Sequence, residues 1–250
     1  RRQRQMCIRD RNGNLIKVSI YVGLENYKNL LQIEKLKKAV FNLSLNEIEN
    51  ITFWKAFRFT FTFCLITLPL VISLGLLIAI TVNNLTQSIK GPVIFISLLP
   101  FIITPIIGAL AIRWLFVGEG ILTSFIEFFL ERDIALFASA WTLEILMIIY
   151  RVWHVAPFAF IVFYAGLQTV NKETLESAVI DGANRFERLR YIVIPHLMPL
   201  IIFVSLIHLM DSYRVFEEIV AFSSQAYVIS LQWLTYDFLT PDDTGNRLIN

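Results

Sequence analysis

Residues 60–82 form an uninterrupted run of 23 positions without a charged side chain. At about 1.5 Å per residue, a helix of that length crosses a hydrocarbon core of roughly 30 Å with some tilt. Pro69 and Gly75 lie inside the run, and bilayer helices tolerate both when neighbouring helices satisfy the freed backbone groups. The run therefore predicts a membrane-spanning helix, and the rest of the chain must fold around a bilayer.

The composition supports a membrane protein. Hydrophobic residues make up 56% of the chain, charged residues only 17%, and the mean hydropathy is +0.63, which is too apolar for a soluble domain. The net charge of +2 and the scattered basic residues exclude a nucleic-acid-binding surface. Cys7 and Cys64 fit neither a disulfide framework nor a metal site, so we expect two free thiols.

Three further apolar segments predict membrane spans, namely 93–112, 134–170 and 191–210. The second is long for one helix, and we expect it to be kinked or broken near Pro157. The run Ala226–Leu239 is too short and too polar to span, so it is interpreted as interfacial or re-entrant. The sequence thus predicts an all-α polytopic membrane protein with four visible spans.

Four spans place the connections 83–92 and 171–190 on the same side of the membrane. Both carry basic residues, which favour the cytoplasmic side: Lys90, Lys172, Arg185, Arg188 and Arg190. Splitting the 134–170 segment into two spans would reverse this assignment.

The domain boundaries follow from these spans. Residues 1–11 are rich in arginine without a following apolar stretch, so we interpret them as an artefact of cloning or assembly, or a disordered leader. Residues 12–59 are predicted to form an extracytoplasmic segment with short helices, 60–213 the transmembrane core, and 214–250 an outer segment.

The pattern of segment 171–190 predicts two short helices hinged at Gly182. Asn171 is a plausible N-cap, and glycine permits backbone angles closed to other residues. One apolar stripe runs along the segment at helical spacing: Leu175, Ala178, Val179, Gly182, Phe186 and Leu189. The stripe predicts a face that a partner buries.

The stretch ESAVIDGANRFERLRYIVIP resembles the EAA loop of ABC importer permeases. The matching positions are Glu176, Ala178, Asp181, Gly182, Ala183, Ile192 and Pro195, with Ser177 and Ile194 as mild departures. The segments GLENYKNLL, LGLLIAI, LLPFIITPIIGALAIRWLF, VWHVAPF and AGLQTV are similar, in this order, to the subfamily of maltose and glycerol-phosphate permeases. The resemblance implies a type-I importer transmembrane domain in a bacterial or archaeal cytoplasmic membrane.

The sequence departs from the family pattern in two respects, and the resemblance implies a set of partners. Six spans are expected, so the chain would lack the first and the last, and AFSSQAYVIS stands where the family has a threonine- and glycine-rich turn. The expected partners are a cytoplasmic ABC ATPase dimer, a second permease subunit, an extracytoplasmic solute-binding protein and membrane lipid. No cofactor, metal or catalytic residue is implied, and a carbohydrate solute is a subfamily expectation.

The resemblance and the pattern together assign the contact with the ATPase to the loop, at Glu173, Glu176, Ser177, Ala178, Asp181, Gly182, Ala183, Phe186 and Arg188. The alternative is an amphipathic loop that lies on lipid headgroups.

Ionisable groups inside spans are costly and usually face a cavity or a partner. Glu144, Arg151, His154 and His208 are therefore candidates for the translocation path, with simple pairing inside the helix bundle as the alternative. A solvated rim at the outer end of the last span is expected from Asp211, Arg214, Glu217 and Glu218.

Two other classes of protein remain as rivals. An ion-coupled secondary transporter or channel would use charged relays or broken helices at the midplane and would need no docking loop. A membrane enzyme would need a nucleophile with its base or a metal-ligand motif, and the sequence shows neither. The motif GxxxxGK[ST] is missing too, so the chain is not expected to hydrolyse ATP.

Overall fold

A computed structural model describes residues 3–9, 15–21, 25–32, 35–37, 41, 51–117, 120–130 and 139–240. The chain divides into two compact units, Arg1–Phe57 and Arg58–Asn250.

The first unit contains a β-hairpin that the sequence analysis did not predict. Strand β1 (Gln3–Arg9) pairs antiparallel with β2 (Leu15–Tyr21), with Gln3 opposite Tyr21. Most of the segment interpreted as an artefact or a disordered leader is therefore a strand. The pair Asn12-Gly13 lies between the two strands in the sequence, and such a pair is a strong hairpin signal. Helix α1 (Glu25–Leu31) follows, and the Trp54 indole donates a hydrogen bond of 3.0 Å to its last carbonyl.

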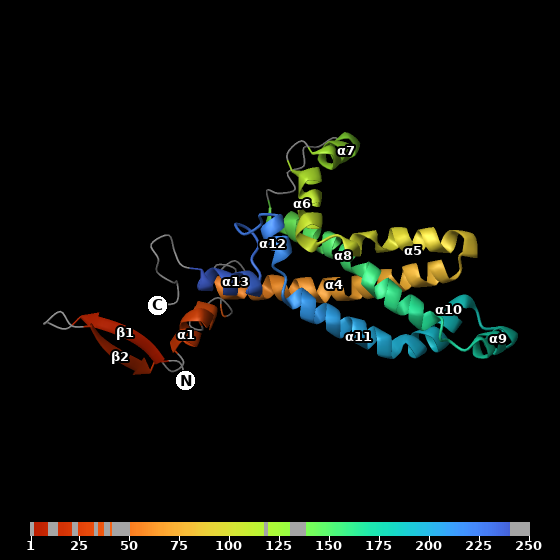
Figure 1. The fold of residues 1–250 in the computed structure, drawn as a ribbon, viewed down its shortest axis with the longest axis horizontal. Coiled ribbons are helices and arrows are strands. Elements are labelled where there is room, and N and C mark those ends of the chain that lie inside the picture. The colour runs from red at the N-terminus through yellow and green to blue at the C-terminus, as the bar shows by residue number, and fades with distance from the viewer. Residues whose placement is uncertain are drawn as a thin grey trace. The chain divides into compact units, whose positions relative to one another are not determined.

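The second unit holds the apolar helices (Figure 1). In chain order they are α4 (Thr52–Asn83, which begins in the first unit), α5 (Gln87–Ile102), α6 (Pro105–Phe116), α7 (Ile121–Leu130), α8 (Ala140–Leu167), α9 (Lys172–Ile180), α10 (Arg185–Arg188), the π-helix η1 (Leu189–Val193), α11 (Ile194–Tyr213), α12 (Glu217–Ala221) and α13 (Leu231–Leu239). The regular structure described in this unit is helical throughout, which confirms the predicted all-α membrane core.

Three helices are long and apolar enough to cross a membrane: α4, α8 and the continuous segment Arg185–Tyr213. The pair α5 and α6 adds a fourth span if it is counted as one. Helix α8 runs without a break through Pro157, so the predicted break there is wrong. Pro157 and its neighbours Ala156 and Ala159 are buried, and this packing holds the helix together across the missing hydrogen bond.

The predicted span 93–112 is not a single helix, because α5 and α6 meet within it at an angle of 93°. Thr104 is extended at φ −61° and ψ 138°, directly before Pro105. A proline disfavours helical angles in the residue before it and has no N–H to donate, so the helix stops and restarts at this point.

Two apolar clusters hold the unit together. One packs Val71 and Ala79 of α4 against Phe160 of α8 and Val204 of α11. The other packs Phe59 and Phe63 of α4 against α8 and the segment 215–228. Many large apolar side chains point outward instead, as suits contact with lipid or other subunits.

At Gly75, α4 lies in close contact with α8. A Cβ atom at this position would lie 2.6 Å from the Cβ of Ala159 and 3.0 Å from the Phe160 backbone nitrogen. Small residues at such crossings let membrane helices pack backbone to backbone.

Gly75→Val is therefore expected to destabilise the fold by about 1–3 kcal/mol, because the added atoms force the helices apart. Thermal unfolding in detergent measures the effect. Ser73→Val, at an exposed position of the same helix, is the matched control. Equal unfolding temperatures for the two variants would show that the close contact contributes nothing.

Candidate functional site

The segment 171–190 folds as predicted into two short helices joined at a glycine. The Asn171 side chain accepts a hydrogen bond of 2.8 Å from the Glu173 backbone N–H, which confirms the predicted N-cap of α9. Gly182 lies in the left-handed region at φ +84°. The Gly182 N–H donates to the Val179 carbonyl at 3.1 Å, and the Ala183 N–H to the Ala178 carbonyl at 2.9 Å. These two bonds form a Schellman motif, which needs a left-handed residue at the position of Gly182.

A second cap, at the start of helix α10, lies two residues after Gly182. The Asn184 side chain accepts from the Glu187 N–H at 2.9 Å, and the Glu187 carboxylate accepts from the Asn184 N–H at 2.8 Å. This reciprocal capping box satisfies donors that a helix start leaves free. From Arg185 the chain stays helical through η1 and α11 to Tyr213, so the joint is coupled mechanically to a membrane span.

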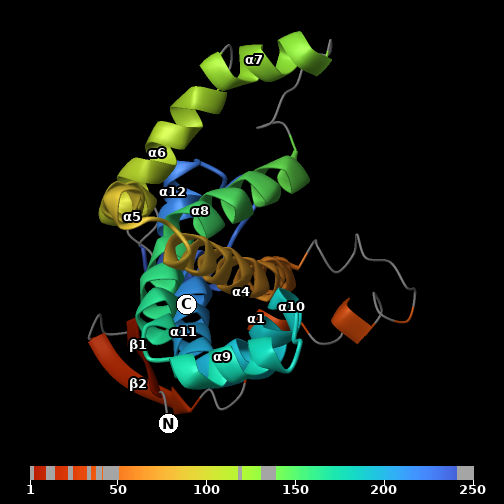
Figure 2. The same cartoon turned by 90° about the vertical axis from the view of Figure 1, so that its right-hand side faces the viewer.

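We call residues 171–190 the elbow. Part of its apolar stripe is uncovered: the exposed fraction is 52% at Val179 and 70% at Phe186, and the adjoining Ile180 is 87% exposed. The elbow lies at the end of the bundle where α4 turns into α5 (Figures 1 and 2). The Gln168 amide donates to the Asn83 side chain at 2.9 Å at this end. The connections 83–92 and 171–190 therefore share one side, as predicted.

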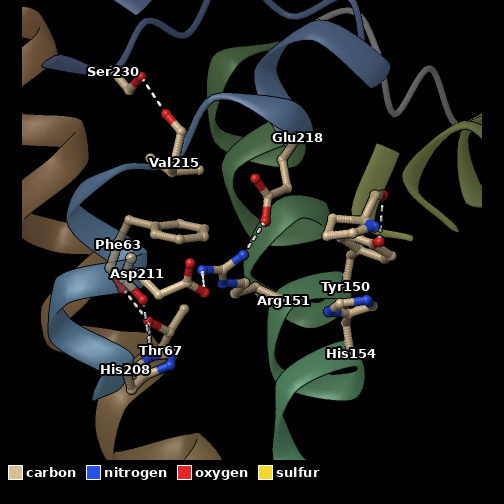
Figure 3. A network of polar contacts seen from close by, with 12 residues as sticks. Phe63, Thr67, Tyr150, Arg151, His154, His208, Asp211, Val215, Glu218 and Ser230 are labelled. Atoms are coloured by element: carbon tan, nitrogen blue, oxygen red, sulfur yellow. Dashed lines mark hydrogen bonds and ion pairs between the residues drawn. The ribbon is translucent and has the colours of Figure 1, made fainter. Parts of the chain in front are cut away.

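Toward the other end of the bundle, Arg151 joins α8 to α11 and α12. It donates to Glu218 at 2.7 Å through Nη1 and to Asp211 through Nη2 (Figure 3). The Arg151 and Glu218 side chains are only 5% and 2% exposed, whereas that of Asp211 is 58% exposed. The predicted solvated rim is thus wrong for Glu218, because a buried arginine requires a counter-charge and the chain folds back to supply one.

Two histidines hold further polar contacts between helices. His154 Nε2 lies 2.8 Å from the Ile103 carbonyl, and the Tyr150 hydroxyl donates to the Pro105 carbonyl at 2.6 Å. These contacts satisfy backbone groups where α5 breaks from α6. His208 Nε2 lies 3.0 Å from the Thr67 hydroxyl and so ties α11 to α4.

Glu144 has a different environment from the other candidates for the path. Its carboxylate accepts two hydrogen bonds from Arg58, at 2.7 and 3.4 Å, and the Arg58 guanidinium lies 5.2 Å from the centre of the Trp141 ring. Glu144 and Arg151 are both buried on α8, as their seven-residue spacing suggested, but they pair with different elements.

A cavity of about 680 Å³ opens beside the Arg151 cluster. Three of the four candidates for the path line it: Arg151, His154 and His208. Phe101, Phe158 and Phe216 contribute apolar walls. Within the described residues, Nδ1 of His154, Nδ1 of His208 and Nε of Arg151 are buried without a hydrogen-bond partner. The cavity lining thus combines aromatic rings with a few charged and polar side chains, a combination typical of small-molecule sites.

Sequence reasoning missed Arg58 and the pairing role of Asp211 and Glu218. The sequence did carry a signal for this pairing, because an isolated charge inside a membrane is costly. Arg151 therefore needed an acidic partner, and Asp211 and Glu218 follow the last predicted span. Which acid turns inward depends on the fold of 214–230, where Ser230 donates to the Val215 carbonyl at 2.6 Å.

Taken together, the spans, the elbow and the polar cavity define a helical membrane transport subunit. Residues 51–216 match the family model described as binding-protein-dependent transport system inner membrane component. The chain belongs to this family, and the predicted resemblance to ABC importer permeases is confirmed.

Curated relatives and solved structures agree with this assignment. A probable ABC transporter permease protein of Pyrococcus horikoshii is 30% identical over 79% of this chain and 67% of its own length. An arabinooligosaccharides permease of Halalkalibacterium halodurans is 27% identical over 79% and 58%, and a trehalose/maltose permease of Thermococcus litoralis 26% identical over 80% and 62%. The chain thus spans about three fifths to two thirds of their lengths.

The fold also matches a crystal structure of a bacterial ABC transporter involved in the import of the acidic polysaccharide alginate. The TM-score is 0.73 at 20% identity, over 87% of this chain and 72% of that one. A second structure, of the alginate transporter with its pentasaccharide-bound periplasmic protein, has a TM-score of 0.63 at 22% identity, over 85% and 83%.

Proposed function

We propose that this chain is the membrane-spanning permease subunit of an ATP-driven importer that takes up a carbohydrate or a related solute. The observation that carries the proposal is the elbow: a capped, glycine-jointed pair of helices with an exposed apolar stripe, continuous with a span. The names of relatives, which include permeases for arabino-oligosaccharides and for trehalose and maltose, support the solute class.

In this proposal the elbow is the contact with a cytoplasmic ATPase dimer. Exposed Val179 and Phe186 supply apolar area that is costly to leave in water, and the partner covers it. Glu173 lies in the first turn of α9, where a negative charge suits the helix dipole. Closure of the ATPase dimer moves the rigid elbow, and α11 carries the movement into the membrane.

The cavity serves as part of the translocation path. Its volume of about 680 Å³ falls within the usual range for small-molecule sites. Arg151, His154 and His208 line it, whereas Glu144 acts through its pair with Arg58 outside it. A second permease subunit completes the path, and an extracytoplasmic solute-binding protein delivers the solute. The chain itself performs no chemistry.

Phe186→Ala is expected to reduce copurification of the partner ATPase subunit several-fold, because it removes the largest exposed apolar side chain of the stripe. A pull-down of the full-length permease, quantified against its own amount, measures the effect. Phe203→Ala removes an exposed phenylalanine from α11, outside the elbow, and is the control. Unchanged copurification of the Phe186 variant would remove the elbow from the interface and favour a loop that lies on headgroups.

An ion-coupled transporter remains the second candidate because of two features: the break between α5 and α6, and the buried charge cluster. Uptake into vesicles separates the two functions. An ATP-driven importer keeps working when an ionophore collapses the ion gradients, provided that ATP is present, whereas an ion-coupled transporter stops.

A further inference from the structure

We infer that the cavity selects by charge, accepting neutral polyhydroxylated solutes and rejecting polyanionic solutes of the same size. The inference rests on the proposed function, because it names the class of solute that the path takes.

The first argument is that the buried cation of the cavity is already neutralised. Arg151 uses one terminal nitrogen for Glu218 and the other for Asp211. An anionic group on the solute would have to displace one of these carboxylates to gain a charge-assisted bond to the same nitrogen. Displaced Glu218 would lie unpaired in a low-dielectric site, which is costly, because its side chain is only 2% exposed. Displacing the exposed Asp211 costs less, but an anion there only replaces one negative partner of Arg151 with another.

The second argument is the balance of charge around the cavity. Two arginines, Arg151 and Arg214, face three acids, Asp211, Glu217 and Glu218, so the lining carries a net charge of −1 with neutral histidines. Arg214 is exposed and unpaired within the described residues, but it shares the opening with exposed Glu217 and Asp211. An anion near Arg214 therefore meets two negative groups as well.

The third argument is that the walls of the cavity suit a neutral sugar. Gln232 adds an uncharged amide to the lining, and an amide both donates and accepts hydrogen bonds, as a hydroxyl group does. The faces of Phe101 and Phe158 offer apolar contact to the C–H surface of a sugar ring.

The test is saturation-transfer NMR on the full transporter in nanodiscs, without the binding protein, with two probes of similar size. Maltotriose is the neutral probe and trigalacturonate the anionic one. Maltotriose is expected to bind at least about tenfold more tightly, the equivalent of roughly 1.4 kcal/mol. Equal binding, tighter binding of trigalacturonate, or binding of neither probe overturns the inference.

Two cavity variants test the mechanism. Asp211→Asn frees one side of Arg151 and is expected to raise trigalacturonate binding at least about fivefold, while Glu217→Gln alters the net charge equally without freeing Arg151 and should raise it less. Asp237→Asn, exposed on α13 outside the cavity, is the control and should change neither probe. A rise in the Asp237 variant as large as in the Asp211 variant overturns the role of Arg151.

The outcome can be told apart from failure of the proposed function. The same preparation is assayed for bound ATPase and for ATP-dependent uptake. If uptake is driven by ATP but the cavity shows no charge selection, the inference is overturned and the proposed function stands. Charge selection in a preparation whose uptake ignores ATP supports the inference and removes the importer assignment.

Discussion

Gly182→Val is expected to lower ATP-driven solute uptake by roughly tenfold or more while the amount of permease in the membrane stays the same. Gly182 has φ +84°, and the left-handed conformation costs a residue with a side chain roughly 1–2 kcal/mol, more when it is β-branched. The added Cβ atom meets nothing within 4 Å inside this chain, so the backbone and not crowding is the cause. Uptake of labelled solute into vesicles that contain the complete transporter measures the effect.

Two variants separate the backbone conformation at Gly182 from the bulk of the added side chain. Gly182→Asn should keep most of the activity, because asparagine tolerates the left-handed region. Gly91→Val adds the same side chain at another glycine with open space around it, on α5, and should leave uptake unchanged. Equal loss in the asparagine and valine variants would assign the effect to bulk at a partner surface and would refute the role of Gly182 as a joint.

Arg151→Met is expected to lower the free energy of unfolding by roughly 3–5 kcal/mol, because it strands the carboxylate of Glu218, which is only 2% exposed. In a chain of this size such a loss corresponds to a fall in Tm of about 6–20 °C. Thermal unfolding of the purified permease in detergent measures it. The effect should exceed that of Gly75→Val, since an unpaired buried charge costs more than a shifted helix contact.

The second partner of Arg151 supplies the control. Asp211 is 58% exposed, so Asp211→Asn should cost no more than about 1 kcal/mol. The double variant Arg151→Met with Glu218→Gln should regain more than half of the lost stability, because no buried charge is then left unpaired and Asp211 is exposed. A double variant as unstable as Arg151→Met would mean that Arg151 acts through packing and not through its pair with Glu218.

Features that depend on neighbouring residues could be predicted well from the sequence. The Asn171 cap and the glycine joint at Gly182 need only local backbone chemistry, and the charge-free run inside α4 needs only its length. The bend at Thr104 had a local signal in Pro105, but the apolar pattern outweighed it. At Pro157 the same local argument failed, because buried neighbours hold α8 continuous.

Contacts between distant residues were beyond the sequence. Arg151 and Glu218 are 67 positions apart in the sequence. The sequence alone did not distinguish a Glu218 exposed to water from a Glu218 buried beside an arginine. The amino-acid pattern established a membrane chain and predicted a loop of two helices hinged at a glycine, since hydropathy and capping act over a few residues. The packing of α8 against α11 and α12 decided which charges meet and what the cavity presents, because burial and pairing depend on groups that only the folded chain brings together.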